Sequence, residues 1–209
     1  MNSKMSKEPK KEGLREKIVK VALDELAVKG HEALSVREIA ALCGVATSAP
    51  NRHFTVKAEL LTELAIQGFQ QLGQAVSIEN QIADQQPVAK LKALCEAYLQ
   101  FASNQQNLYR LMFSHGLFTA DGSVKIEALK PAILWPIKAA SADVFPSDPS
   151  NPSAAAELVG ILWAFLHGLS LLMLDNLADD EQRIASSIQF LDHSIDTIVA
   201  GIQSKAQPE

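Results

Sequence analysis

The sequence predicts an all-α protein of about nine helices, with an N-terminal three-helix helix-turn-helix domain and a larger C-terminal helical domain. Apolar residues recur every three or four positions along most of the chain, which is the period of an α-helix. Capping and glycine stop signals divide the first sixty or so residues into short helices, and two long apolar segments close the chain. We therefore expect a basic tail over residues 1–11, a helix-turn-helix domain over 12–61 and a second domain over 62–205.

The first predicted helix runs from about residue 10 to residue 29. Its apolar stripe repeats every four residues and consists of Leu14, Ile18, Ala22 and Leu26, widened by Val19 and Leu23. Gly30 follows the last turn and is expected to end the helix, because glycine accepts the backbone conformation that closes a helix.

The second predicted helix begins with a capping box. Ser35 lies three residues before Glu38, so the hydroxyl of Ser35 is expected to accept a backbone N–H while the glutamate reaches back. The apolar face of this helix consists of Val36, Ile39, Ala40 and Cys43. Gly44 ends the helix and leads into a tight turn.

The third predicted helix, about residues 47–53, carries hydrogen-bonding groups that suit base edges and phosphates. Small residues at its start allow it to approach another backbone closely, Phe54 anchors its end in the core, and Thr55 is a good N-cap for the next helix. A compact pair of helices is typical of a reader of the DNA major groove. On spacing alone, a small helical bundle without DNA binding explains the pattern about equally well.

The same segment resembles the tetracycline-repressor (TetR) family of bacterial transcription regulators. The resemblance covers about the first 65 residues and rests on Arg15, Ile18, Ala22, Gly30, residues 35–40, Gly44, Val45, residues 52–54, Lys57, Leu60 and Leu61. It implies that residues 47–53 are the recognition helix and that Arg37 and Lys57 contact phosphates. The candidate DNA-binding residues are Ser35, Arg37, Thr47, Ser48, Asn51, Arg52, His53 and Lys57.

Asn51 departs from the pattern of the family, which usually has at this position a tyrosine that contacts the DNA backbone. Asparagine is still able to bond a phosphate or read adenine. The resemblance therefore implies DNA binding with an unusual affinity or site preference.

Charge is distributed unevenly along the chain. The net charge is −5, but residues 1–61 contain eleven Lys and Arg against eight Asp and Glu, giving +3, and residues 62–209 carry −8. The basic charge therefore coincides with the helix-turn-helix, and binding is expected to weaken with salt. The basic tail either reaches along the DNA or is only solvated, and the sequence favours neither interpretation.

The middle of the chain is expected to hold a small-molecule pocket. Predicted helices over about 57–77, 87–104, 108–115 and 122–140 carry aromatic residues with few polar tips, a mixture that lines ligand sites and also ordinary cores. The candidate pocket residues are Phe69, Tyr98, Phe101, Met112, His115, Phe118, Trp135, Trp163 and His167. Their lack of fixed charge favours a small apolar effector. The TetR resemblance implies that this effector moves the 57–77 helix, which Gly68 and Gly73 weaken.

The last two predicted helices suggest a homodimer. Residues 154–174 are apolar almost all round, and the final helix carries isoleucines and a leucine at steps of four and three, which is a seam for a partner helix. The candidate interface residues are Leu162, Leu166, Ile184, Ile188, Leu191, Ile195 and Ile198. A membrane anchor over 154–174 is the alternative, but His167 interrupts this run and only acidic residues follow it.

A second, shorter resemblance lies inside this apolar run. Trp163, His167 and Gly168 resemble the Trp…His-Gly signature of one TetR-type C-terminal domain, called the WHG domain, and residues 108–113 fit the same group. The alternative interpretation is that Trp163 and His167 are core residues and that Gly168 allows close helix contact.

The sequence carries no motif of a common enzyme class. It has no GxSxG elbow, no glycine-rich phosphate loop and no HExxH, and its five histidines show no metal-ligand spacing. We expect no catalytic residue, no metal and no cofactor. Cys43 and Cys95 lie on apolar faces and are expected to be buried thiols. The N-terminus does not resemble a signal peptide, which favours the cytoplasm.

The sequence therefore predicts a ligand-responsive transcriptional regulator, usually a repressor in this family. It is expected to bind a palindromic operator as a dimer and to be released by a small apolar effector. The alternative is a helical protein that binds small molecules or partners and has lost specific DNA binding.

Overall fold

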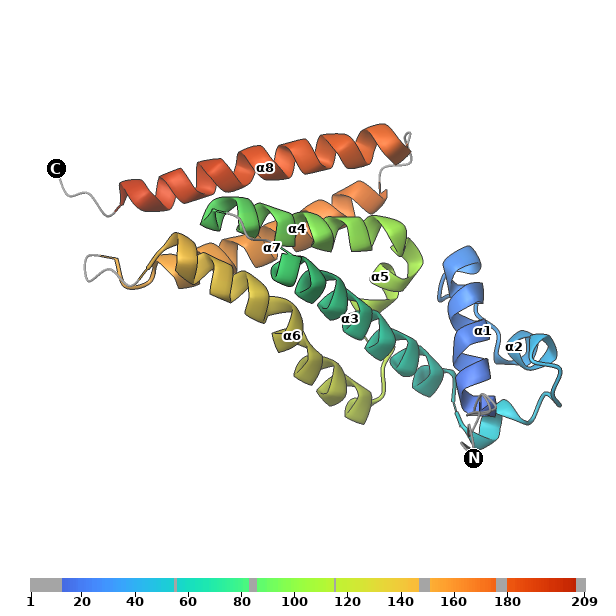
Figure 1. Cartoon of the computed structure of the whole chain (residues 1–209). Helices are drawn as coiled ribbons and strands as arrows, with labels where there is room; N and C mark the ends of the chain where they lie inside the picture. Colours follow the sequence, from blue (N-terminus) through green and yellow to red (C-terminus); the bar gives the residue numbers. More distant parts are fainter. Residues whose placement is uncertain are drawn as a thin grey trace, which may run out of the picture.

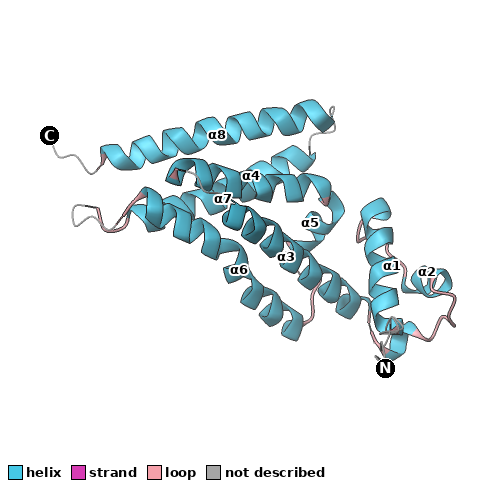
Figure 2. Ribbon diagram, viewed as in Figure 1, coloured by secondary structure: helices cyan, strands magenta, loops and turns pink. Residues whose placement is uncertain are grey.

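The computed structural model describes residues 13–54, 56–82, 86–114, 116–146, 151–175 and 180–205. Within these residues the chain forms eight α-helices and one short 3₁₀-helix, and no strand, which confirms the all-α prediction (Figures 1 and 2). The elements are α1 (Leu14–Lys29), α2 (Val36–Leu42), η1 (Pro50–Arg52), α3 (Lys57–Ile82), α4 (Pro87–Asn104), α5 (Gln106–Met112), α6 (Ala120–Val144), α7 (Ala154–Asp175) and α8 (Asp180–Ser204).

The N-terminal helices pack as the apolar stripes predict. Ile18, Ala22 and Leu26 of α1 are fully buried, and Ile39 of α2 and Phe54 pack in the same core. Gly13 caps α1, because its N–H donates to the Glu16 carboxylate at 3.1 Å. Gly30 ends α1 with a positive φ of 75°, a conformation that a side chain would disfavour.

Helix α3 connects the two halves of the molecule. It begins beside α1 and runs into the middle of the C-terminal helices, where it contacts α4, α5 and α6 (Figure 1). It continues to Ile82, about five residues beyond its predicted end. Leu60 and Leu61 at its start and Leu72 and Val76 further along belong to one continuous core, so the two domains share a single packed interior.

Two glycines mark where other helices approach α3 closely. A Cβ added at Gly68 of α3 would lie 2.6 Å from Met112 Sδ of α5, and one added at Gly122 of α6 would lie 2.2 Å from Thr62 Cγ2 of α3. The backbone N–H of Thr119 also donates to Thr62 Oγ1 at 3.2 Å. Gly68 therefore serves tight packing of α5 on α3, a role that its helix-weakening effect did not predict.

Helices α4, α6 and α8 surround α7 on its buried side. Both Pro131 and Pro136 lie inside α6, which runs past them to Val144. By length and composition alone, α7 is apolar enough to cross a membrane, and 33% of its most apolar stretch is buried in this fold. Its contacts with three other helices favour a core helix with one uncovered face.

Candidate functional site

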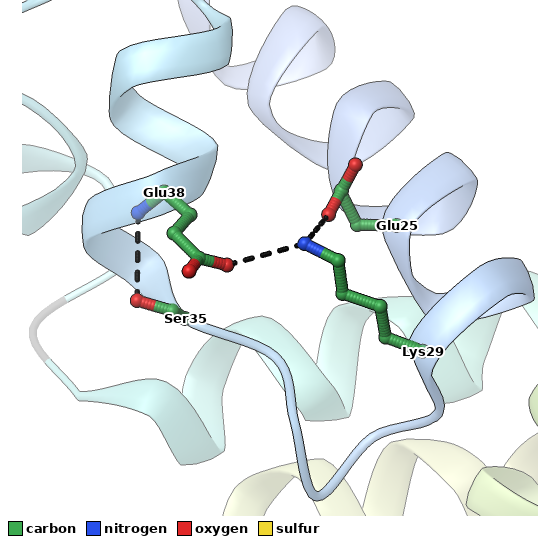
Figure 3. A network of polar contacts seen from close by, with 4 residues as sticks. All are labelled: Glu25, Lys29, Ser35 and Glu38. Carbon is green, nitrogen blue, oxygen red and sulfur yellow. Dashed lines mark hydrogen bonds and ion pairs between the residues drawn. The ribbon is translucent and has the colours of Figure 1, made fainter.

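A polar network fixes α2 against α1, and thereby positions the segment that follows it (Figure 3). Lys29 Nζ lies 2.5 Å from a Glu25 carboxylate oxygen and 3.3 Å from one of Glu38. The hydrogen bonds to Glu25 and then to Glu38 raise the pKa of Lys29. Ser35 Oγ accepts the N–H of Glu38 at 3.4 Å, as predicted, but the glutamate side chain reaches across to Lys29.

The far end of α2 is held by a second lysine. Lys17 Nζ of α1 donates to the carbonyl of Cys43 at 2.9 Å, which satisfies a carbonyl at the end of α2. Arg15 links α1 to α3, because its guanidinium lies 2.6 Å from a Glu63 oxygen and 5.3 Å from the centre of the Phe54 ring. Helix α2 is thus held at both ends by side chains of α1, and α1 is in turn linked to α3.

Residues 47–53, called here the recognition segment, do not form the predicted α-helix. Turns over residues 47–49 lead into the 3₁₀-helix η1, with bonds from Ala49 N–H to Ala46 O at 2.8 Å and from Arg52 N–H to Ala49 O at 3.2 Å. Pro50 contributes to this difference, because it has no N–H to donate to Ala46, whereas Ala49 before it keeps helical dihedrals (φ −65°, ψ −40°). The helix predicted over residues 47–53 did not take this proline into account.

The candidate DNA-binding residues fall into two groups. The exposed side chains are Arg37 on α2 and Thr47, Ser48, Arg52 and His53 in the recognition segment. The other two described side chains have structural partners, since Ser35 caps α2 and Lys57 Nζ donates to the carbonyl of Glu32 at 3.0 Å. The side chain of Asn51 and the whole of Thr55 lie outside the described residues.

The C-terminal helices line a partly open cavity of about 350 Å³. It lies among α3, α5, α6 and α7, and its lining consists of Phe69, Met112, Phe113, Ser114, Gly116, Phe118, Ser123, Ile126, Glu127, Lys130, Trp163 and His167. Five of the nine predicted pocket residues are therefore brought together, namely Phe69, Met112, Phe118, Trp163 and His167. Phe113 is the aromatic residue that the prediction missed, although it follows Met112 directly.

A group of rings, called here the aromatic cluster, forms the inner wall of this cavity and the layer behind it. Its members are Tyr98, Tyr109, Phe113, Trp163 and His167. The Trp163 and His167 rings are nearly parallel, with 10° between their planes, and the Phe113 ring centre lies 4.4 Å from that of His167. Such ring pairs add to the stabilisation that burial alone provides.

Three polar atoms of the aromatic cluster form a chain of hydrogen bonds. The Tyr98 and Tyr109 hydroxyls are 3.0 Å apart, and the Tyr109 hydroxyl lies 2.9 Å from His167 Nδ1. Both tyrosines are fully buried, and this burial raises the pKa of each. Tyr98 does not line the cavity, but it is linked to it by these hydrogen bonds and by an edge-on contact with Trp163.

Two of the predicted pocket residues lie elsewhere, and a third falls outside the part of the chain that the structure describes. Trp135 is 72% exposed on α6, and Phe101 lines a different cavity, formed with residues of α3 and α4. His115 lies outside the described residues. Helical spacing placed Trp135 among other apolar residues but gave no information on which side of α6 the core lies.

A larger cavity of about 520 Å³ lies between α1 and the junction of α4 and α5. Its lining is mostly polar, with Asp24, Gln71 and residues 103–107, and Asn107 Nδ2 donates to the Ala27 carbonyl of α1 beside it at 2.9 Å. Small-molecule sites are mostly apolar with a few placed polar groups. The cavity at the aromatic cluster fits that description better, although it is smaller.

Four of the predicted interface residues are core residues of this chain. Leu162, Leu166, Leu191 and Ile195 are fully buried within it and so have no surface left for a partner, whereas Ile184, Ile188 and Ile198 are partly buried. The uncovered face of α7 instead carries Gly160, Ile161, Ala164, Gly168 and Leu172, and Phe190 of α8 is exposed beside Phe165.

The described residues include no group of three His, Cys, Asp or Glu side chains that would hold a metal ion. Cys43 and Cys95 are buried free thiols. Burial raises the pKa of Cys95 to about 12, so this thiol stays protonated and unreactive at neutral pH.

Comparisons with known proteins give matches over both halves of the chain. Residues 18–64 match the model of the tetR family of bacterial regulatory proteins, and residues 91–197 match that of the tetracyclin repressor-like C-terminal domain. A search of the curated proteins found no match.

Several solved structures have the same fold. PfmR, a TetR family transcriptional regulator from Thermus thermophilus, is 19% identical with a TM-score of 0.64, over 88% of this chain and 97% of that one. A regulatory protein of the tetR family from Rhodococcus RHA1 is 15% identical with a TM-score of 0.67, over 87% and 96%. AibR, solved with isovaleryl coenzyme A and operator DNA, is 18% identical with a TM-score of 0.62, over 85% and 97%.

Proposed function

The chain belongs to the TetR family of bacterial DNA-binding transcriptional regulators, which are not enzymes, and from that premise we propose that it is a cytoplasmic repressor. It binds a palindromic operator as a homodimer and is released by a small apolar effector. The observation that carries this proposal is the pairing of an exposed recognition segment with a cavity lined by aromatic residues, joined by the single helix α3.

DNA contact is proposed for the exposed side chains around α2 and the recognition segment. Thr47, Ser48, Arg52 and His53 are placed to reach base edges or phosphates, and Arg37 to reach a phosphate. Because η1 is a single turn, this chain offers a shorter reading element than an α-helix over the same residues. Ser35 and Lys57 are proposed to support this surface through the bonds that fix α2 and the turn before it.

The homodimer is proposed to form through the uncovered faces of α7 and α8. A Cβ added at Gly160, Gly168 or Gly201 would meet no atom of this chain within 4 Å. Close packing within the chain therefore does not explain these glycines. They still need an explanation, because a glycine inside a helix costs about 1 kcal/mol relative to alanine. Space for the helices of a second copy explains them, and the exposed Leu172 and Phe190 supply apolar area beside them.

Leu172→Asp tests this interface by placing a charge on it. Sedimentation is expected to give a dimer for the parent protein and a monomer for the variant. Val124→Asp is the matched control, since Val124 is 71% exposed on α6, outside the proposed interface. A parent protein that sediments as a monomer at micromolar concentration contradicts the proposal.

Effector release is proposed to proceed through the helices that line the cavity. Phe69 lies in the cavity wall and on the same helix as Lys57, whose ammonium holds the turn before α2. Helix α5 carries Met112 in the cavity wall and Asn107, which donates to α1. A ligand that favours one arrangement of α3 and α5 therefore shifts the N-terminal domain, provided that it binds the two arrangements unequally.

Two finer assignments accompany this proposal. The C-terminal domain is proposed to be of the WHG type, because Trp163 and His167 stack in the cavity wall while Gly168 faces open space. A ligand is supported by the solved relative AibR, which was captured with both an acyl coenzyme A and operator DNA.

Selection of genomic DNA fragments by the purified protein tests the function as a whole. We expect enrichment of a palindromic site, and loss of that enrichment in the double variant Arg37→Ala/Arg52→Ala. Both arginines are exposed, so their removal spares the fold, whereas Lys57 has a structural bond. Unchanged selection by the double variant contradicts the placement of the DNA contacts.

The alternative function is a helical ligand-binding protein without specific DNA binding. Pro50 favours it, because this residue replaces a recognition helix by one 3₁₀ turn. Recovery of no enriched fragment by a protein that still binds ligand in its aromatic cavity would support this alternative.

A further inference from the structure

Three buried polar groups behind the cavity wall determine what His167 offers to a ligand. The Tyr98 hydroxyl of α4 bonds the Tyr109 hydroxyl of α5 at 3.0 Å, which in turn bonds Nδ1 of His167 on α7 at 2.9 Å. Tyr98 is fully buried and does not line the cavity, so its hydroxyl acts on a ligand through the hydrogen bonds of the other two residues, while its ring packs edge-on against Trp163.

The direction of the hydrogen bonds follows from counting hydrogens and acceptors. Both tyrosines stay protonated at neutral pH, because burial raises their pKa. If Tyr98 donates to Tyr109 and Tyr109 donates to Nδ1 of His167, every hydroxyl hydrogen has an acceptor. The Ser170 hydroxyl lies close enough to Tyr109 to oppose the rise in its pKa, but by distance and angle its oxygen has no hydrogen-bond partner among the described residues, so it is not counted as an acceptor.

The opposite direction leaves a buried hydrogen without an acceptor. If Nδ1 of His167 carried a proton and donated to Tyr109, one of the two tyrosine hydroxyl hydrogens would have no partner among the described residues. A His167 ring protonated on both nitrogens would also donate from Nδ1 to Tyr109, and it would leave the same hydroxyl hydrogen without an acceptor. Buried polar groups without partners are strongly disfavoured, so the network assigns the neutral ring with its proton on Nε2.

We propose that the cavity recognises effectors through a hydrogen-bond acceptor oxygen, which receives the Nε2–H of His167, while the rest of the effector is apolar. This inference rests on the proposed function only in taking the cavity as the effector site. Because the two nitrogens lie on different edges of the ring, holding Nδ1 toward Tyr109 directs Nε2 away from it. An effector oxygen competes with whatever acceptor this N–H has in the free protein.

The remaining walls define the rest of the ligand. Phe69, Met112, Phe118 and Ile126 supply apolar surface opposite the stacked Trp163. The two charges at the cavity, Glu127 and Lys130, pair with each other at 2.5 Å, so they present no net charge to a ligand. These walls favour a neutral carbonyl compound over a carboxylate, and both classes share the acceptor oxygen.

The first test is the protonation state of His167 in the wild-type protein. Nitrogen-15 NMR of the labelled histidines separates a protonated ring nitrogen from a bare one, and the His167 signals are those lost in His167→Phe. We expect a bare Nδ1 and a protonated Nε2 in the wild type, and a mixture of tautomers in Tyr98→Phe/Tyr109→Phe. A protonated Nδ1 in the wild type overturns the proposal.

The second test measures ligand preference with Trp163 as the reporter. The chain has two tryptophans, and Trp135 is exposed away from the cavity, so Trp135→Phe leaves only the one in the cavity wall. The probes are phenyl ketones from acetophenone to octanophenone, each paired with the alkylbenzene of the same skeleton, and phenylacetate as the carboxylate. We expect each ketone to bind about fivefold tighter than its hydrocarbon, as one hydrogen bond provides.

Removal of the donor should abolish that preference. In Trp135→Phe/His167→Phe the ketone and the hydrocarbon are expected to bind equally, since phenylalanine keeps a ring against Trp163 but has no N–H. Equal binding of each pair by the parent, or binding of none of the probes, overturns the proposal. Tighter binding of phenylacetate than of the ketones supports the oxygen acceptor and identifies a carboxylate as its source.

Failure of this inference is distinguishable from failure of the proposed function. Tryptophan fluorescence requires no DNA, so ligand preference is measured whether or not an operator exists. Operator binding without ligand by His167→Phe, together with a lost preference for ketones, supports both statements. Operator binding in a protein whose cavity prefers hydrocarbons overturns the inference alone.

Discussion

The recognition segment and the aromatic cluster meet opposite physical demands. The recognition segment exposes Thr47, Ser48, Arg52 and His53 and is held by one buried proline and a few backbone bonds. The aromatic cluster buries Tyr98 and Tyr109, and its polar atoms bond one another. Exposed functional residues are therefore separable from the fold, whereas residues of the cluster serve the fold and the site together.

This difference decides how mutations should be interpreted. A substitution of an exposed side chain in the recognition segment is expected to change DNA affinity at almost no cost in stability, because surface positions seldom matter to folding. A substitution in the cluster lowers stability as well, so a loss of ligand response there proves nothing until folding has been measured.

The largest effect is expected at Leu162, which precedes Trp163 on α7 and is fully buried. Leu162→Ala should lower the free energy of unfolding by about 2–5 kcal/mol, because it leaves a cavity in a packed core. Urea denaturation measures this loss. Val124→Ala is the control at an exposed position outside the proposed interface, and its effect on stability should stay within about 0.5 kcal/mol. Equal losses would mean that α7 is packed differently.

Tyr109→Phe should follow with a loss of about 1–3 kcal/mol, because it strands the buried Tyr98 hydroxyl and removes the partner of His167 Nδ1. Tyr98→Phe should cost less, since the Tyr109 hydroxyl still donates to Nδ1. The double variant should lose less than the sum of the two single losses, because the stranded hydroxyl is gone. Strictly additive losses would contradict a connected chain of hydrogen bonds.

The positions of the helices could be predicted from the sequence better than the residues that pack against each helix. Helical spacing found α1, α2, α4 and α7, because 3.6-residue periodicity is a local property. The same spacing does not say what covers an apolar stripe, so Leu162 and Leu191 were assigned to a partner although they pack in their own chain. Trp135 was likewise assigned to a pocket that lies on the other side of α6.

The aromatic cluster and the recognition segment also differed in how much of their geometry could be predicted from the sequence. Five pocket residues were found because large rings gather at cavities, but the bond from Tyr109 to His167 joins residues 58 positions apart and has no local signal. The geometry of the recognition segment did have a signal, in Pro50. The missing N–H of that residue predicts a break in a regular α-helix at this point.

Ser35→Ala should lower the free energy of unfolding by about 0.5–2 kcal/mol, the usual cost of losing an N-cap. The lower end is expected, because the bond from Glu38 N–H to Ser35 Oγ is long at 3.4 Å and Lys29 also holds Glu38. Ser35→Thr keeps the cap and should restore most of the loss. A loss in Ser35→Thr as large as in Ser35→Ala would show that the hydroxyl is not the stabilising group.

Arg52→Ala should leave stability within about 0.5 kcal/mol, because the side chain is exposed. Its effect should appear in operator binding, where the loss of one phosphate contact lowers the magnitude of the salt slope, d log K/d log[salt], by about 1. Lys138→Ala removes the same charge from the exposed surface of α6 and is the matched control. If the two variants weaken binding equally, the arginine acts only through net charge. If Arg52→Ala alone weakens it and stability is unchanged, the recognition segment is a contact surface whose function is separable from the fold.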